Sequence, residues 1–176
     1  KKKKKFDAIS ECSAFFESID EEFSLASPDA KRIAASWCAR IVAAKDESLA
    51  ATMLERAESL GEGIETRIAR SYLLFFAEGD RRRALALIAD IDTDAGRSSR
   101  AILVSHGEPP DVGLQHIDEE GLRFDQLDSD GKFAVLQKTI AAGLWDRGVQ
   151  HVAALTEEDF AKTPSLLLSA AALLLV

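Results

Sequence analysis

Cysteine is scarce in this chain, with two residues, Cys12 and Cys38, among 176. A small secreted scaffold held together by disulfides would contain more cysteine, so the sequence excludes that class of protein. Both cysteines lie within apolar, helix-like stretches, which favours buried free thiols in a reducing compartment. We therefore expect a cytoplasmic protein.

Proline is also scarce, with four residues, and no stretch shows the apolar–polar alternation of a half-buried strand. Alanine and leucine, which have high helix propensity, dominate the composition. A length of 176 residues with 47% hydrophobic side chains is sufficient for one domain with a substantial core. The sequence therefore predicts an all-α fold in a single domain over residues 6–176.

The chain has no apolar run long enough to cross a bilayer. The lysines at the start are followed by Phe6-Asp7-Ala8, which differs from the apolar core of a signal peptide. The apolar stretch 166–176 is shorter than the about 20 residues that a membrane-spanning helix needs. We expect no membrane partner.

Basic residues are fewer than acidic ones, 22 against 30, which gives the chain a net charge of −8. Five of the basic residues form the run Lys1–Lys5, which we interpret as an artificial basic tail and leave out of the fold. The rest of the chain then has 17 basic and 30 acidic residues, a net charge of −13. Because such a body repels phosphate backbones, we expect no nucleic-acid partner.

Complete sets of metal ligands are lacking. The segment Asp128-Ser129-Asp130-Gly131 imitates part of a calcium-binding loop, but Gln126 and Gln137 stand where that loop needs carboxylates. We interpret the segment as a helix start capped by Ser129 or Asp130. No zinc-type spacing involves the three histidines, which are His106, His116 and His151. We expect no metal and no other cofactor.

Catalytic signatures are lacking as well. Ser105-His106-Gly107-Glu108 places a hydroxyl, an imidazole and a carboxylate together, but catalytic triads are assembled in space from separate segments. We therefore expect a protein that is not an enzyme. The alternative is a small enzyme or nucleotide binder that uses His106, Glu108 and nearby arginines. The run Arg81, Arg82, Arg83 is either a solvated helix start or a contact for an anion or an acidic partner.

The sequence does contain a series of helical segments. Ser27-Pro28-Asp29 is a helix start, with a capping hydroxyl, a proline at the first helical position and an acid, and Asp46 caps the next helix. The stretch 106–129 contains Pro109-Pro110 and three glycines and predicts short helical turns at most. The expected helices cover 7–26, 28–45, 46–60, 64–78, 80–91, 96–105, 130–143, 145–155 and 164–176.

Two of these segments share a spacing, in which a small residue and two apolar residues follow a glycine by five, nine and twelve positions. The first copy is Gly79, Ala84, Ile88 and Ile91, and the second is Gly143, Gly148, Val152 and Leu155. A glycine that ends one helix, a small residue at the contact and two apolar residues one turn apart are typical of a helical hairpin.

On these residues the chain resembles the tetratricopeptide repeat family, with weaker copies that start at Ala44 and Gly107. The resemblance covers residues 30–165 and is divergent, since the Trp-x-x-Leu-Gly-x-x-Tyr pattern of the family does not occur. It implies antiparallel helix pairs that stack as a short right-handed α-solenoid. It also implies a scaffold that binds a protein or peptide partner on its concave face.

The same resemblance suggests which residues contact a partner. If Gly79 and Gly143 each close a hairpin, one set of side chains points into the concave groove. This predicted groove set is Leu73, Phe76, Phe133, Gln137 and Ile140. The alternative for this set is a plain core position. The aromatic group Tyr72, Phe75 and Phe76, with Trp37 and Trp145, is expected in the interior.

The last expected helix, residues 164–176, carries leucines all around its circumference. We expect it to contact further repeats of a longer parent chain or a second copy, because an end repeat normally has a polar outer face. The chain is then one region of a larger protein. The favoured function is a non-catalytic protein–protein interaction module, and the alternative is a regulatory or sensor segment that controls an attached effector domain.

Overall fold

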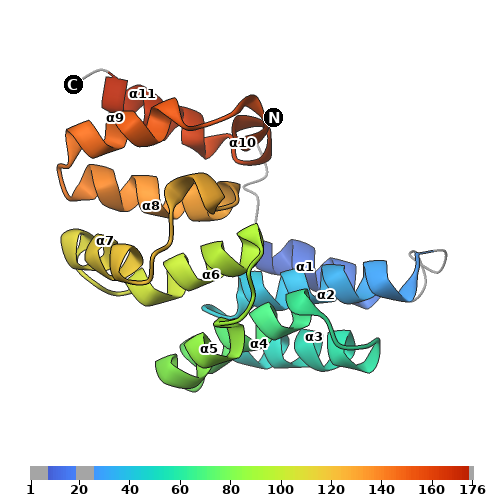
Figure 1. Cartoon of the computed structure of the whole chain (residues 1–176). Coiled ribbons are helices and arrows are strands. Elements are labelled where there is room, and N and C mark those ends of the chain that lie inside the picture. Colours follow the sequence, from blue (N-terminus) through green and yellow to red (C-terminus); the bar gives the residue numbers. More distant parts are fainter. Residues whose placement is uncertain (1–7, 19–25, 175–176) are drawn as a thin grey trace. The chain divides into compact units, whose positions relative to one another are not determined.

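The computed structural model describes residues 8–18 and 26–174 and is all-α over these residues, with eleven α-helices, one short 3-10 helix and no strand in this part (Figure 1). The expected all-α fold is confirmed. The chain divides into two compact units, residues 1–88 and 89–176, here called the N-terminal and C-terminal units. The basic tail at 1–5 lies outside the described residues, and the single-domain organisation stays a prediction.

The N-terminal unit is built on α2, which packs against α1, α3 and α4, while α5 packs against α4. Ala35 and Ala57 are fully buried at its centre, and Phe15 packs against them. The two predicted helix starts are confirmed: Ser27 Oγ accepts a hydrogen bond from the Ala30 N–H, and the Asp46 carboxylate accepts one from the Leu49 N–H. The helices are α1 (Ala8–Ser18), α2 (Pro28–Val42), α3 (Glu47–Ser59), α4 (Ile64–Phe76) and α5 (Arg81–Ile88).

The C-terminal unit is built around α8, which contacts α6, α7, α9, α10 and α11. Its core includes leucines from four helices, each at most 1% exposed, namely Leu103, Leu114, Leu136 and Leu166. The elements are α6 (Asp94–Ser105), α7 (Pro110–Glu119), η1 (Phe124–Gln126), α8 (Ser129–Ala141), α9 (Trp145–Ala153), α10 (Glu157–Lys162) and α11 (Ser165–Leu174). Helix α8 therefore fixes the position of the three helices that follow it.

Two local predictions in this unit are wrong. The stretch 106–129 contains a ten-residue helix, α7, because Pro110 occupies the first helical position, where a proline costs no hydrogen bond. The start of α8 is capped by Asp128, whose carboxylate accepts a hydrogen bond from the Gly131 N–H at 2.9 Å, and not by Ser129 or Asp130. Ser129 instead donates a hydrogen bond to Asp159.

The glycines of the predicted hairpins do end helices. Gly79 and Gly143 have φ angles of +67° and +69°, a left-handed conformation that favours glycine at a helix C-terminus. The small residues that follow are buried, but the close neighbour of Gly148 is Leu173 of α11, whose Cδ2 would lie 2.6 Å from an added Cβ. The contact expected within a hairpin is thus made to α11. The tetratricopeptide-like repeat and the solenoid stay predictions.

Ala84→Leu is expected to lower the free energy of unfolding by about 1–3 kcal/mol, because Ala84 is fully buried in α5 and a larger side chain there would overpack the core. Ala86→Leu, two residues further along the same helix, is the control, because Ala86 is exposed. Urea unfolding measures both. Equal stabilities of the two variants would show that Ala84 does not form a close helix contact.

Candidate interaction surface

Helix α11 has an inner face and an outer face of different exposure. Its inner face consists of Leu166, Ala170 and Leu173, which recur at one-turn spacing and are 0%, 6% and 4% exposed. Its outer face contains Leu167 and Leu168, which are 55% and 77% exposed, together with the exposed Ala171 and Ala172. None of the described residues of α11 is charged, and Ser165 is its one exposed residue with a hydrogen-bonding side chain.

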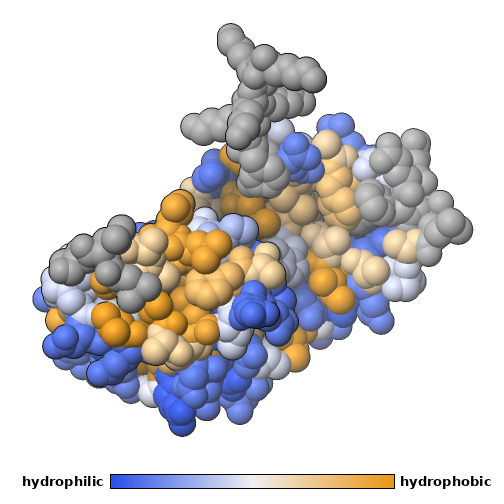
Figure 2. Space-filling model, turned by 90° about the horizontal axis from the view of Figure 1, so that it is seen from above, coloured by the Kyte–Doolittle hydropathy of each residue, from blue (hydrophilic) through white to orange (hydrophobic). Residues whose placement is uncertain are grey.

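Helix α9 contacts α11 and extends this apolar surface. Leu144, just before α9, and Trp145 and Val149 within it are 41%, 42% and 46% exposed. Figure 2 looks down on these helices and shows apolar residues gathered over this part of the C-terminal unit. We call this surface the α9–α11 face: Leu144, Trp145, Val149, Leu167, Leu168, Ala171 and Ala172.

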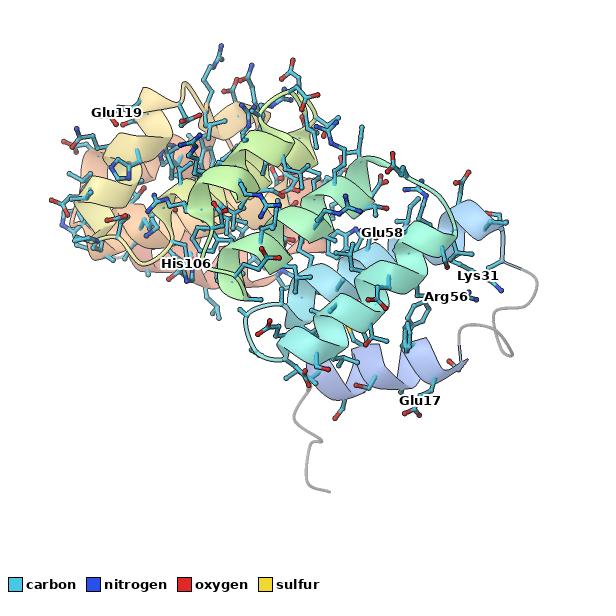
Figure 3. The ribbon with its side chains drawn as sticks, turned by 90° about the horizontal axis from the view of Figure 1, so that it is seen from below. Glu17, Lys31, Arg56, Glu58, His106 and Glu119 are labelled. Carbon is cyan, nitrogen blue, oxygen red and sulfur yellow. The ribbon has the colours of Figure 1, made fainter. Side chains whose placement is uncertain are left out.

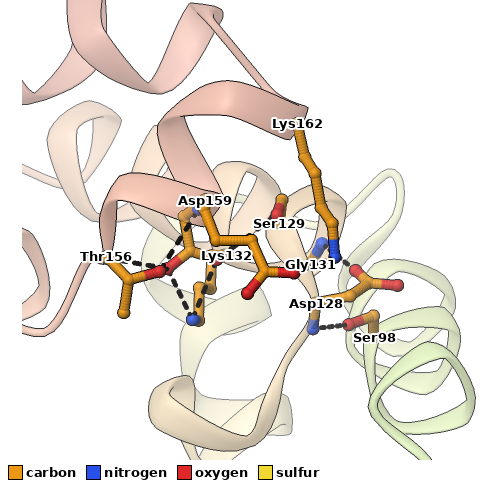
Figure 4. Close-up of polar contacts among 9 residues, drawn as sticks. Ser98, Asp128, Ser129, Gly131, Lys132, Thr156, Asp159 and Lys162 are labelled. Carbon is orange, nitrogen blue, oxygen red and sulfur yellow. Dashed lines mark hydrogen bonds and ion pairs between the residues drawn. The ribbon is translucent and has the colours of Figure 1, made fainter.

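A buried ion pair holds α10 against α8 and so positions the start of α11 (Figure 4). Lys132 Nζ lies 2.8 Å and 3.0 Å from the two carboxylate oxygens of Asp159, and the side chains of both residues are less than a tenth exposed. Asp159 also accepts a hydrogen bond from the Thr156 N–H, while its own N–H donates to Thr156 Oγ1, which completes a capping box. Both carboxylate oxygens are therefore satisfied within the unit.

This pairing decides the charge of Asp159. Burial by itself raises the pKa of a carboxyl group, but the hydrogen bonds from Lys132 and Thr156 more than offset it, so that the pKa of Asp159 is lowered. Asp159 is ionised at neutral pH, and Lys132 neutralises it. The pair therefore stabilises the fold and presents no unpaired charge for chemistry.

A second polar cluster holds α9 on its other side. The His151 ring stacks on Phe124 with centroids 4.1 Å apart, and Arg147 Nε donates a hydrogen bond to His151 Nε2. Arg147 also forms a bidentate pair with Asp118 of α7, with N–O distances of 2.7 Å and 2.8 Å. Burial and the nearby Arg147 lower the pKa of His151 to about 4, although Asp118 opposes this shift. His151 is neutral at pH 7.

Stability is expected to fall as the pH drops from about 6.5 to about 4, because His151 then takes up a proton only in the unfolded chain. The contribution is complete above pH 6.5 and is lost as the pH approaches the folded pKa. His151→Phe, which keeps a ring against Phe124, should flatten the curve between pH 7 and pH 5. Parallel curves for the two proteins in urea unfolding would contradict this assignment.

No family model, curated protein or solved structure matches the chain. Within the described residues no three His, Cys, Asp or Glu side chains come together as metal ligands. No helix of this part has the length and apolar character needed to cross a membrane. The α9–α11 face is therefore interpreted from its own geometry.

The structure places the predicted groove set in both units. Leu73 and Phe76 lie half-buried on α4 in the N-terminal unit, where the Phe76 ring contacts the rings of Tyr72 and Phe75. Phe133, Gln137 and Ile140 lie on α8 in the C-terminal unit, where Gln137 Nε2 donates a hydrogen bond to Ser169 Oγ of α11 at 2.6 Å. Helix α11 thus occupies part of the surface that Gln137 was expected to offer to a partner. As a joint binding set, these residues stay a prediction.

The predicted polar contacts are distributed along the chain. Arg82 and Arg83 are exposed at the start of α5, Arg81 is half-buried, and Arg83 pairs with Glu78 and Asp80 at 3.6 Å and 3.8 Å. His106 is exposed just after α6, as Figure 3 shows. Ser105 Oγ is buried and donates a hydrogen bond to the Ala101 carbonyl, so it does not face a surface. The anion contact and the alternative that uses His106 and Glu108 stay untested.

The expectation that the tryptophans are interior is wrong. Trp37 is 46% exposed and lies under the Arg40 guanidinium, whose carbon is 4.3 Å from the ring centroid, and Trp145 is 42% exposed. The part of the surface on α9 was missed for this reason. Its signal was present in the sequence, since Trp145 and Val149 lie one turn apart on a helix that also carries Asp146, Arg147 and Gln150.

Proposed function

We propose that this chain is a non-catalytic protein–protein interaction module and that its partner binds the α9–α11 face. The observation that carries the proposal is the uncharged outer face of α11, where Leu167 and Leu168 are more than half exposed. Contiguous apolar surface of this kind marks interaction sites in proteins, whereas single exposed leucines do not. The cytoplasmic location expected from the two cysteines belongs to the same proposal.

The energetics favour a bound partner. Removal of a leucine side chain from water is worth roughly 1.5–3 kcal/mol, and the face exposes two leucines on α11 and a tryptophan on α9. Tryptophan at the centre of an interface, surrounded by polar residues, is among the residues that contribute most of the binding energy. The buried Lys132–Asp159 pair and the Arg147–Asp118 pair hold the helices that carry the face. A partner therefore meets a surface that is already ordered.

Site-specific photo-crosslinking in cells tests the proposal. A photoreactive residue at Leu168 should give a discrete crosslinked protein, which Leu167→Ser should abolish by removing the adjacent contact. The control is the same photoreactive residue at Glu119, which is exposed on α7 in the same unit (Figure 3). Equal crosslinking from positions 168 and 119, or none from 168, would refute binding through the α9–α11 face.

A further inference from the structure

The chemistry of the partner follows from where the charge of this chain lies. Residues 89–176 contain 15 acidic and 7 basic residues, which gives −8, whereas residues 6–88, without the basic tail, contain 15 acidic and 10 basic residues, which gives −5. The unit that carries the α9–α11 face therefore has the larger share of the negative charge. A field of one sign around an apolar surface selects partners of the opposite sign.

Exposed acids lie at both ends of this face. Asp146 is in the first turn of α9, and Glu157 and Glu158 are in the first turn of α10, which follows the end of α9. Helix α11 then runs back alongside α9, so the apolar surface lies between these two acidic positions (Figure 1). The nine residues of α9 span about 13 Å.

The basic residues near this face already form ion pairs within the chain. Arg147 forms its bidentate pair with Asp118, and Lys162 forms an ion pair with Glu158 at 2.7 Å. The outer face of α11 contributes no charge. The acids at the two ends, Asp146 and Glu157, are therefore available to basic side chains of a partner.

We infer that the α9–α11 face binds a basic amphipathic helix, with an apolar stripe about three turns long and Lys or Arg at both ends. This inference rests on the proposed function and adds the partner's chemistry. The stripe covers Leu167, Leu168, Trp145 and Val149, and the terminal cations meet Asp146 and Glu157. A second copy of the chain fits less well, because it would bring another unit of charge −8 and acids at the same positions.

Two synthetic peptides test this inference on the full chain. Both carry the same three-turn leucine stripe, and one has two lysines at each end where the other has two glutamates. Fluorescence anisotropy should show that the lysine peptide binds about tenfold more tightly, as expected for a few exposed ion pairs. The preference should weaken as salt is raised and should reverse in the double variant Asp146→Lys, Glu157→Lys.

A matched control and three outcomes make the test decisive. Asp111→Lys with Glu119→Lys makes the same change in net charge at exposed positions on α7, and it should leave most of the preference intact. Equal binding of both peptides, abolished by Leu168→Ser, would overturn the basic partner but leave the proposed function standing. Binding of neither peptide would overturn the inference, while the crosslinking at Leu168 decides the proposed function separately. Sedimentation could instead show a dimer that Leu168→Ser converts to a monomer. This result would identify a second copy of the chain as the occupant and overturn the inference.

Discussion

Asp159→Ala is expected to lower the free energy of unfolding of the C-terminal unit by about 3–5 kcal/mol. The substitution leaves the Lys132 ammonium buried without a counter-charge and removes the capping box at Thr156. Burial of an unpaired charge is among the most costly single changes in a folded protein. Urea unfolding monitored by Trp145 fluorescence measures the loss, in a Trp37→Phe background that removes the other tryptophan.

Two controls separate the causes of this loss. Glu158→Ala, at the exposed neighbouring position, should change stability by about 0.5 kcal/mol or less. Lys132→Met combined with Asp159→Ala should recover most of the loss and leave about 1 kcal/mol, the usual value of a helix cap. If the double variant were no more stable than Asp159→Ala alone, the ion pair would not be the cause.

The same pair predicts a further loss of stability in acid. The pKa of Asp159 is lower in the folded chain than in the unfolded chain, so its contribution is present above the unfolded value of 3.8 and is lost as the pH falls through the folded value. This window lies below that of His151, whose effect develops between about 6.5 and about 4. The two groups therefore act in successive pH ranges.

The features that the sequence predicted correctly are local ones. Ser27 and Asp46 cap helices by accepting a hydrogen bond from the backbone N–H three residues further on. Gly79 and Gly143 end helices by adopting a positive φ angle. Each of these features depends on residues within one helical turn, so the local sequence is enough to predict it. The missed helix α7 shows the limit of local signals, because Pro110 is compatible with a helix start as well as with a loop.

The candidate surface could be predicted only in part. The leucines of α11 were visible in the sequence, but which of them face inward depends on α8 and α9, which pack against it. The Lys132–Asp159 pair joins residues 27 positions apart, and no periodic pattern indicates such a contact. Trp145 was expected in the core because large aromatics are usually buried, and its exposure follows from the absence of a covering helix in the described part of the C-terminal unit.

The two leucines Leu166 and Leu168 should respond oppositely when each is replaced by alanine. Leu166 is fully buried, so Leu166→Ala should cost about 2–5 kcal/mol of unfolding free energy, through lost burial and the cavity left behind. Leu168 is 77% exposed, so Leu168→Ala should change stability by less than about 0.5 kcal/mol.

The binding of a partner should reverse this order. Leu168→Ala should weaken binding of the lysine-ended peptide by about tenfold, because truncation of a central apolar contact costs more than 1 kcal/mol. The leucines lie two positions apart on one helix, so helix propensity and composition are matched, and only the direction of the side chain differs. Equal losses of stability in the two variants would show that α11 is not seated as described. An unchanged affinity in Leu168→Ala would remove the outer leucines from the binding surface.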